Sequence, residues 1–428
     1  MTKKKILFIH QNFPGQFKSI APFLAFTKKY EVHTLSWKKT NVEEDFLSSM
    51  KDLKHHQYVI NTNSSKNIHS LAAEFETKMI RADHVAKKCL ALKEKGFIPD
   101  LIIDHPGWGE TFLIKEIWQD AKILSYFEFY YNTSNSDIDF DMEQVIVKGY
   151  DMTTKLLARN APINMSYLTC DKIISPTKFQ KSTAPSWFRS KINVIHDGID
   201  TDIIKPGPDD CFIDINYQAD ADQKSKKIKL TKKDKIITFV NRNLEPYRGY
   251  HSFMRALPKI QNKHPDAFIL VIGGDGVSYG APHPSGESFK NIFFNEVKDS
   301  LINPNKIYFL GKVQYDIFMK IIDLSSVHVY LTYPFVLSWS MLEIMALEKV
   351  VVGSRTGPVE EVIKDKENGL LVDFFDVEDI SEKVIDVLSN PKKYNDIRKM
   401  ARKTIIDNYD LRRVCLPKQM KLIEGLLK

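Results

Sequence analysis

The residues from His328 to Ile363 read HVYLTYPFVLSWSMLEIMALEKVVVGSRTGPVEEVI. The apolar run at 329–332 contains β-branched residues and predicts a buried strand, which the following Tyr333-Pro334 pair ends. After a short loop, Ser338 or Ser340 is expected to cap a helix that reaches residue 347. This interpretation places Glu343 in the first turn of the helix.

A second buried strand is predicted at 350–353, directly after this helix. Strand, loop, helix and strand form a βαβ unit, which is typical of a parallel sheet covered by helices. The backbone N–H groups of Trp339, Ser340 and Met341 would lie at the N-terminus of the helix, at the positive end of its dipole. This geometry suits the binding of a phosphate.

The length of 428 residues predicts two domains, because a single core rarely grows to this size. Hydrophobic residues at 43% and charged residues at 27% are ordinary for a water-soluble globular protein. No apolar run approaches the roughly 20 residues that span a bilayer. The start of the chain resembles a signal peptide, but His10 ends its apolar part too early, so we expect a strand there.

The cysteines and the net charge restrict the function classes further. The four cysteines are far apart, and their spacing favours neither a zinc site nor a disulfide framework: Cys89, Cys170, Cys211 and Cys415. A cytoplasmic location is the simplest inference. The net charge of +7 is mild and no dense basic run is present, so nucleic acid is not an expected partner.

Basic residues are frequent near the N-terminus, at Lys28, Lys29, Lys38, Lys39, Lys51 and Lys54. Peripheral contact with the inner face of an anionic membrane is one interpretation of these lysines. A merely solvated face is favoured over it.

The first half of the chain has the pattern of a doubly wound α/β domain. Strands are expected at 5–10, 30–35, 101–104, 123–127, 172–175 and 192–195, and helices at 17–28, 70–95, 151–161 and 177–182. Gly15 lies in the first loop, where the backbone must approach a ligand or a neighbouring helix. His105 follows the strand at 101–104, at the edge where ligands of open α/β sheets gather.

The same pattern starts again after an irregular linker. A loose polar segment is expected at about 207–234. Strands at 236–240, 268–272 and 307–310 and helices at 250–262, 377–388 and 392–409 add to the βαβ unit described first. The predicted fold class is therefore α/β, with two Rossmann-like doubly wound domains.

Several short motifs resemble, in order and spacing, those of the family 4 glycosyltransferases, which are retaining enzymes of the GT-B fold. In chain order they are PGQF at 14–17, SPT at 175–177, VIHDGID at 194–200, Arg242 followed by Arg248-Gly249, LEIMA at 342–346, TGPVE at 356–360 and NGLLV at 368–372. The resemblance covers nearly the whole chain. It implies an acceptor-binding domain at 1–197, a nucleotide-sugar-binding domain at 198–409 facing it across a cleft, and a helix at about 410–428 that crosses back to the first domain.

The resemblance also assigns roles to charged residues. Arg242 and Arg248 match the cations that contact the donor diphosphate, a leaving group that needs positive partners as it departs. The second family cation is usually a lysine five positions after the first, whereas Arg248 stands six positions after Arg242. Glu343 matches an acid that accepts hydrogen bonds from ribose hydroxyls, and His105 matches a histidine near the donor sugar.

Loop residues complete the predicted site. Gly15 and Gln16 would let donor phosphates approach the first loop, although a tight turn alone would also explain Gly15. Gly274 would lie near the nucleobase or mark a plain turn. Ser338 and the backbone of 339–341 would hold phosphate or sugar oxygens. The resemblance implies no cofactor and no metal, because protein cations and helix dipoles replace a metal.

One position departs from the family pattern. The first acid of the E-x7-E motif should lie eight residues before Glu343, and the sequence has Phe335 there. Since this acid lies close to the transferred sugar in the family, its replacement implies altered donor contacts.

A cluster of acidic residues follows the strand at 123–127. It consists of Glu128, Asp137, Asp139, Asp141 and Glu143. Contact with an acceptor or a cation is one interpretation, and a solvated acidic loop is favoured over it.

The favoured function is transfer of a sugar from a UDP-, GDP- or ADP-sugar to a glycan, a lipid-linked sugar or another hydroxyl acceptor, in cell-surface polysaccharide or glycoconjugate biosynthesis. The departing phosphate oxygen would act as the base, which explains why no dedicated nucleophile is visible. Two alternatives stay open: an epimerase of the same fold that acts on the sugar nucleotide itself, and a degenerate member that binds glycans without catalysis.

Overall fold

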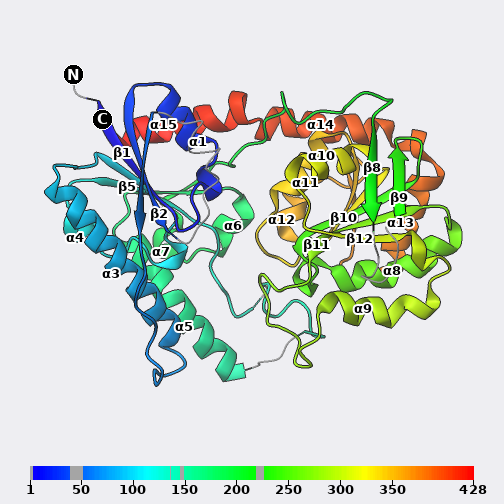
Figure 1. Cartoon of the computed structure of the whole chain (residues 1–428), viewed down its shortest axis with the longest axis horizontal. Coiled ribbons are helices and arrows are strands. Elements are labelled where there is room, and N and C mark those ends of the chain that lie inside the picture. The colour runs from blue at the N-terminus through cyan, green and yellow to red at the C-terminus, as the bar shows by residue number, and fades with distance from the viewer. Residues whose placement is uncertain (1–2, 39–51, 135, 145–148, 218–225) are drawn as a thin grey trace. The chain divides into compact units, whose positions relative to one another are not determined.

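The computed structural model describes residues 3–38, 52–134, 136–144, 149–217 and 226–428, so Lys39 and Lys51 lie outside the described residues. The chain divides into two compact units (Figure 1). Unit 1 contains Met1–Asp139, Val145–Gly198 and Leu411–Lys428, and unit 2 contains Phe140–Gln144 and Ile199–Asp410. Each unit has a parallel sheet of its own.

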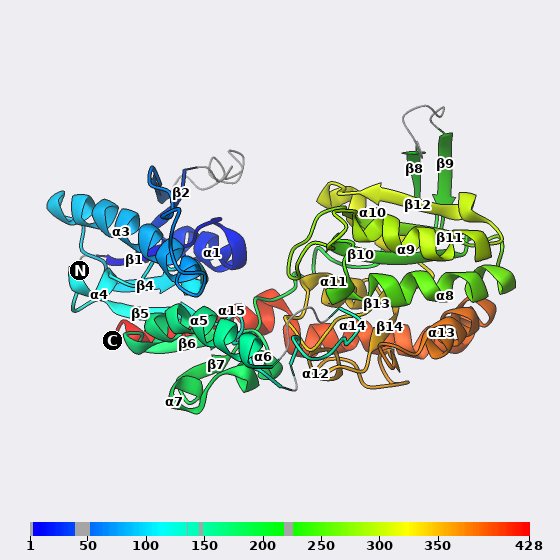
Figure 2. The same ribbon diagram turned by 90° about the horizontal axis from the view of Figure 1, so that it is seen from below.

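Unit 1 is built on a parallel sheet with the order β3-β2-β1-β4-β5-β6-β7 (Figure 2). Its strands are β1 (Lys4–Ile9), β2 (Tyr30–Trp37), β3 (Leu53–Tyr58), β4 (Leu101–Asp104), β5 (Lys122–Tyr126), β6 (Lys172–Ser175) and β7 (Ile192–Val194). The strands expected in this half are present. β3 was not expected, because its sequence LKHHQY is mostly polar and gives no hydrophobic signal.

Helices cover both faces of this sheet, as the alternation of side chains along β1 requires. Leu7 and Ile9 share a core with α3 (Ala73–Glu94) and α5 (Gly149–Leu168). Ile6 and Phe8 share the opposite core with α1 (Ile20–Phe26). The remaining helices of this half are α4 (Ile114–Ile117), α6 (Lys178–Thr183) and α7 (Ser186–Arg189).

Two helices of this unit differ in length from the prediction. The helix expected at 17–28 is a short 3-10 turn, Gly15–Phe17, followed by α1. The helix expected at 151–161 continues to Leu168 through Pro162. Pro162 and Tyr167 are buried, so packing holds the later turns although the proline removes one backbone donor.

The C-terminal segment belongs to unit 1. A π-helical turn, Leu411–Cys415, leads into α15 (Leu416–Leu426). Leu416 and Ile423 are buried in the core that contains Ile6 and Phe8. The prediction that the last helix returns to the first domain is confirmed.

Unit 2 contains a second parallel sheet, with the order β12-β11-β10-β13-β14-β15. Its strands are β10 (Ile236–Asn243), β11 (Phe268–Gly274), β12 (Ile307–Gly311), β13 (Val327–Tyr330), β14 (Val350–Ser354) and β15 (Leu370–Val372). The order runs outward from β10 in both directions, so the sheet is doubly wound and ligands are expected near the carboxyl ends of its strands.

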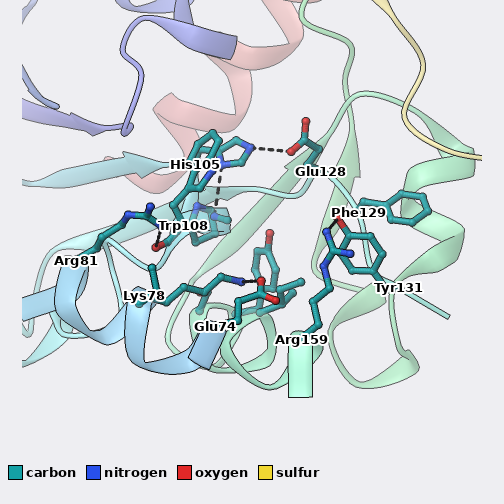
Figure 3. A pocket seen from close by; sticks show the side chains of 15 residues that line it. Glu74, Lys78, Arg81, His105, Trp108, Glu128, Phe129, Tyr131 and Arg159 are labelled. Atoms are coloured by element: carbon teal, nitrogen blue, oxygen red, sulfur yellow. Dashed lines mark hydrogen bonds and ion pairs between the residues drawn. The ribbon is translucent and has the colours of Figure 1, made fainter. Parts of the chain in front are cut away.

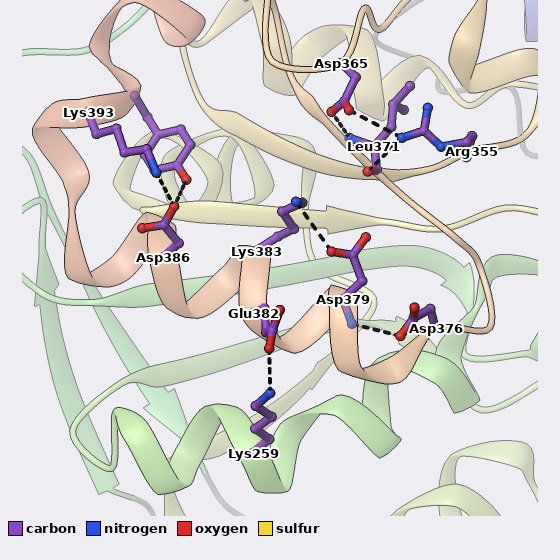
Figure 4. A network of polar contacts seen from close by, with 11 residues as sticks. Lys259, Arg355, Asp365, Leu371, Asp376, Asp379, Glu382, Lys383, Asp386 and Lys393 are labelled. Atoms are coloured by element: carbon purple, nitrogen blue, oxygen red, sulfur yellow. Dashed lines mark hydrogen bonds and ion pairs between the residues drawn. The ribbon is translucent and has the colours of Figure 1, made fainter.

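Helices again cover the sheet on both faces. They are α8 (Tyr250–Lys263), α9 (Phe289–Val297), α10 (Tyr315–Leu324), α11 (Trp339–Ala346), α12 (Gly357–Glu360), α13 (Val377–Ser389) and α14 (Asn395–Tyr409). Polar contacts tie α13 to its surroundings (Figure 4). The Asp376 carboxylate caps the helix by accepting from Asp379 N–H at 2.9 Å, and Lys259 of α8 lies 3.2 Å from Glu382.

The loose polar segment expected at 207–234 contains regular structure. Strands β8 (Phe212–Tyr217) and β9 (Lys226–Thr231) form an antiparallel pair. Ile213 and Leu230 are buried in the unit 2 core, whereas Asp214, Lys227 and Lys229 between them are exposed. The abundance of lysine and aspartate concealed a strand pattern in which only alternate residues are buried.

Candidate functional site

The site residues predicted in unit 2 lie at or after the ends of three neighbouring strands, β11, β10 and β13. Arg242 lies at the end of β10, and Gly274 ends the adjacent β11. The loop from Leu331 to Ser338 connects β13 to α11. Because these strands are parallel, their carboxyl ends meet at one edge of the sheet, and the structure brings these residues to that edge.

Arg248 is buried and points into the protein. The residue is 5% exposed, and its Nη1 donates to Thr332 Oγ1 at 2.7 Å and to the Val336 carbonyl at 2.9 Å. Its guanidinium also lies 5.0 Å from the centre of the Tyr279 ring. Arg248 therefore holds the loop between β13 and α11 through these hydrogen bonds. Its spacing from Arg242 in the sequence did not indicate that its side chain is buried there.

Arg242 has the opposite environment. Its side chain is exposed, and it makes no hydrogen bond or ion pair with any other residue that the structure describes. An exposed guanidinium without a protein partner retains all its donors for an anionic ligand.

The N-terminus of α11 is capped by Ser338. Its Oγ accepts a hydrogen bond from Ser340 N–H at 3.3 Å, and the helix starts at Trp339. Of the two predicted caps, Ser338 is thus the one used. Glu343 consequently lies beyond the first turn, and the prediction that placed it in the first turn is wrong. A favourable interaction with the positive end of the helix dipole therefore does not explain why position 343 carries an acid.

Glu343 is buried and already holds one polar partner. It is 5% exposed, and its Oε1 accepts a hydrogen bond from the Tyr315 hydroxyl at 2.7 Å. Burial and the charge of Glu343 raise the pKa of Tyr315, so the phenol remains a donor. Tyr315 starts α10, and no sequence motif had singled it out.

Phe335, which replaces the expected acid, is packed among aromatic rings. It lies 5.5 Å from Tyr247 and 5.0 Å from Tyr279, measured between ring centres, and both contacts are edge-on or strongly tilted. The Arg248 guanidinium lies 5.8 Å from its ring. The rings of Phe335, Tyr247 and Tyr279 thus form an aromatic wall at this position.

Glu245 is a residue that the sequence interpretation missed. Its carboxylate is 1% exposed and accepts hydrogen bonds from the backbone N–H groups of Ser278, Tyr279 and Gly280, at 3.1 to 3.4 Å. The loop after β11 is therefore held by an acid on the neighbouring loop. Its place between Arg242 and Arg248 was the only available signal.

Gly274 lies where no larger residue fits. A Cβ atom there would come within 2.6 Å of Asn243 Oδ1 and 2.8 Å of Lys312 Cε. Its carbonyl accepts from Leu244 N–H at 2.9 Å. Close approach of two strand ends explains this glycine, and its predicted contact with a nucleobase stays a prediction.

The first loop of unit 1 is built around His10, another residue that the sequence interpretation did not select. Its Nε2 lies 2.8 Å from Gln16 Oε1, and its Nδ1 accepts from Asn12 N–H at 2.9 Å. Gly15 has a φ of +47°, and a Cβ there would come within 2.3 Å of the His10 ring. Burial, together with the nearby His105, lowers the pKa of His10 to about 3, so it stays neutral.

His105 lies next to His10 at the end of β4. The two ring centres are 5.2 Å apart, and His105 Nε2 lies 3.5 Å from Glu128 Oε2. Burial lowers the pKa of His105, but the hydrogen bond and charge of Glu128, with smaller effects of Glu110 and Asp104, outweigh it and leave the pKa raised. A buried imidazole beside a carboxylate can hold or pass a proton at Nε2.

His105 lines a cavity of about 250 Å³ in unit 1 (Figure 3). Aromatic residues Trp108, Phe129 and Tyr131 line it as well. Helices α3 and α5 contribute Lys78, Arg81 and Arg159, among others. An aromatic and charged cavity of this size suits a sugar or a similar polar group.

The solvated acidic loop that was favoured after β5 is wrong for two of its acids, whereas Asp139 and Glu143 are exposed. Asp137 and Asp141 are 2% and 3% exposed. Asp141, which belongs to unit 2, accepts from the Tyr333 hydroxyl at 2.5 Å and lies 3.2 Å from His251 Nε2. The contacts of Asp141 attach Phe140–Gln144 to the rest of unit 2, and composition could not reveal this contact between distant parts of the sequence.

No helix within the described ranges is long and apolar enough to cross a membrane.

Comparison with known proteins identifies the family. Residues 30–204 match the family described as Glycosyl transferase family 4 group, and residues 220–404 match Glycosyl transferases group 1. An uncharacterized glycosyltransferase of Methanocaldococcus jannaschii is 27% identical over 208 residues, which are 47% of this chain and 48% of that protein. The chain spans about half the length of the curated relatives it matches.

Solved structures match over nearly the whole chain. Sucrose-phosphate synthase from Thermosynechococcus elongatus has a TM-score of 0.72 at 15% identity, and 99% of each chain is covered. HepE of Anabaena, solved in complex with UDP and glucose, has a TM-score of 0.68 at 14% identity, with 99% of this chain and 100% of that chain covered. At such identities these matches establish the GT-B fold alone. The two sequence matches, which follow one another along the chain, show that the protein belongs to the group 1 and family 4 glycosyltransferases.

Proposed function

We propose that this protein is a retaining glycosyltransferase that moves a sugar from a nucleotide-sugar donor to a hydroxyl of a glycan or lipid-linked acceptor. Family membership supports transferase activity. The observation that carries the proposal is Arg242, an exposed guanidinium at the carboxyl end of β10 that has no partner in the described part of the chain. It lies next to the strand that leads into α11. A cation and a helix N-terminus at one sheet edge suit a diphosphate.

In the proposed reaction, unit 2 binds the donor and unit 1 binds the acceptor. Arg242 and the N-terminal turn of α11 neutralise the diphosphate, and Glu343 accepts from ribose hydroxyls. The acceptor oxygen forms a bond to the anomeric carbon on the face where the bond to phosphate breaks, so the configuration is retained. The departing phosphate oxygen takes the hydroxyl proton.

Arg248 has a different task in this proposal. Since both its strong hydrogen bonds go to the loop between β13 and α11, it positions that loop for the donor. Phe335 adds an aromatic surface where related enzymes have a carboxylate. Donor contacts on that side are then made by rings and backbone.

The test is Arg242→Ala. Loss of one pre-oriented cation at a departing phosphate is expected to lower turnover by about 100-fold. Because the side chain is exposed and pairs with no residue that the structure describes, the free energy of unfolding is expected to change by less than about 0.5 kcal/mol. Lys306→Ala is the matched control, since it removes a cation before β12, at the opposite edge of the same sheet. Near-parental turnover in Arg242→Ala would refute the proposal.

Donor choice is tested first with a panel of UDP-, GDP- and ADP-sugars. A ligand that binds only the folded protein raises its stability by RT ln(1 + [L]/Kd), so a thermal shift identifies the base. UDP-sugars head the panel, because Anabaena HepE was solved with UDP and glucose. Conversion of a donor alone into an isomer would identify an epimerase instead.

A further inference from the structure

The cavity of unit 1 carries positive charge that its own acids do not balance. Lys78 and Arg81 reach it from α3, and Arg159 reaches it from α5 (Figure 3). Glu74 and Glu128 also line it. Glu74 pairs with Lys78 at 3.0 Å, and Glu128 lies 3.5 Å from His105. Both acids therefore have cationic partners of their own.

Neither arginine forms an ion pair of this kind with the residues that the structure describes, although burial raises the pKa of the Glu110 carboxyl and the charge of Arg81 opposes this rise. Arg81 Nη1 makes a long hydrogen bond of 3.5 Å to the Trp108 carbonyl, and its buried Nε has no hydrogen-bond partner among the residues that the structure describes. Arg159 donates to the Tyr131 hydroxyl at 2.7 Å, and its guanidinium lies 3.6 Å from the centre of that ring. Among the described residues, no carboxylate lies within 4.0 Å of a guanidinium nitrogen of either arginine.

The pKa of Lys78 shows the effect of this positive charge. It is 6% exposed, and its pKa is lowered, first by burial and further by the positive charges of Arg159 and Arg81, against the opposing effect of Glu74. Like charges this close disfavour one another. An anion between the helices would relieve the repulsion and satisfy the remaining N–H donors of Arg81.

We propose that this cavity binds a carboxylate or phosphate group carried by the acceptor, with Arg81 and Arg159 as its anion-binding residues. Guanidinium groups offer forked donors that match both anions. Trp108, Phe129 and Tyr131 also line the cavity and add apolar surface that a sugar ring can contact. The proposal rests on the proposed function, to which it adds the chemical class of the acceptor.

Binding is tested first, without turnover. Isothermal titration calorimetry compares glucose 6-phosphate, methyl glucuronide and neutral methyl glucoside on the full chain. The anionic compounds are expected to bind at least about tenfold more tightly than methyl glucoside, as charged hydrogen bonds require. Arg81→Gln and Arg159→Gln are each expected to remove this preference. Lys87→Gln is the matched control, because it removes an exposed lysine from α3 that does not line the cavity.

The variants Arg81→Lys and Arg159→Lys test whether misfolding explains the loss of the anion preference in the Gln variants. Each keeps the charge, so part of the anion preference is expected to return. Loss of the preference in the Gln variants together with an unchanged thermal transition supports the proposal. Equal binding of neutral and anionic compounds by the parent protein overturns it, as does a preference that survives in the double Gln variant.

Transfer assays separate this inference from the proposed function. With the donor found in the panel, the KM for the anionic acceptors is expected to rise at least about tenfold in each Gln variant, with little change for a neutral acceptor. Transfer that ignores acceptor charge overturns the anion site while the transferase stands. Absence of transfer from any donor refutes the proposed function. The calorimetry then still decides whether the cavity binds anions. The two anionic compounds distinguish a phosphate from a carboxylate site.

Discussion

His328 lies in β13 with its ring fully buried. Its Nδ1 is 2.9 Å from Thr238 Oγ1, and its buried Nε2 has no hydrogen-bond partner within the described ranges. Burial lowers the pKa of this histidine to about 3. In the unfolded chain, in contrast, the pKa of this histidine is near its ordinary value of about 6.5. Neutral His328 therefore supports folding above about pH 6.5, and this contribution is lost as the pH falls from 6.5 toward 3.

The variant His328→Gln removes this dependence. At pH 5 the buried imidazole costs about 2 kcal/mol of the free energy of unfolding relative to pH 7. We expect the fall in stability between pH 7 and pH 5 to be smaller by about that amount in the variant, as measured by urea unfolding. His69→Gln removes an exposed imidazole and should leave the fall as in the parent. Equal losses in His328→Gln and in the parent would contradict the prediction.

Single residues also show how much of the candidate site could be predicted from the sequence. Arg242 and Arg248 were predicted together because their types and spacing match a phosphate-binding pair. Gly249 has a φ of +70° and turns the chain between them and α8, and Arg248 enters the interior. Spacing along a chain does not specify which face a side chain takes after a turn, so the exposed and the buried arginine looked alike. Their catalytic roles stay predictions.

At the scale of elements, the loop after β11 depends on Glu245. Three successive N–H groups of this loop, at Ser278, Tyr279 and Gly280, share one buried carboxylate. Asn243 adds a hydrogen bond from Nδ2 to Ser278 Oγ at 2.7 Å. The same loop carries Tyr279, which contacts Phe335 and Arg248. Glu245 therefore supports the aromatic wall indirectly.

Glu245→Ala is expected to release this loop. Loss of a buried acceptor for several N–H groups should lower the free energy of unfolding by about 1–3 kcal/mol. Amide hydrogen exchange should rise at 278–280 and stay low in β10, because the strand keeps its own ladder. Glu287→Ala, an exposed acid of the same loop, is the control and should change neither quantity. Protected amides at 278–280 in Glu245→Ala would refute this role.

Regular elements were predictable where one physical signal dominated. The strands at 101–104 and 172–175 were predicted with their observed limits, because short apolar runs bounded by polar residues have few other interpretations. The strands β8 and β9 were missed, since lysine and aspartate fill their exposed positions. The start of α11 was left open between Ser338 and Ser340, and the use of Ser338 places Glu343 two residues deeper in the helix than a cap at Ser340 would.

At the scale of the whole molecule, the chain leaves unit 1 and returns to it at its end. Ile199 N–H donates to the Tyr409 carbonyl at 2.8 Å, and Thr201 donates to Asp410, so unit 2 is closed by its own residues. The next residues, from Leu411 onward, pack on unit 1. Only the family resemblance predicted this return. The last residues pack on a core formed by elements far away in the sequence, so their own sequence does not reveal where they pack.

Removal of residues 411–428 should therefore destabilise unit 1 and spare unit 2. The deletion withdraws Cys415, Leu416 and Ile423 from the unit 1 core and exposes the side chains beneath them, at a cost of about 5 kcal/mol. It also removes the hydrogen bond from Gln419 Nε2 to the His196 carbonyl. Scanning calorimetry is expected to show one transition shifted to lower temperature and the other retained. The full-length double variant Leu416→Ala, Ile423→Ala keeps the segment and should produce the same shift with smaller amplitude, since it removes apolar contacts and leaves the backbone in place. A deletion that lowers both transitions equally would mean that unit 2 also depends on the last helix, against the contacts that close it at Asp410.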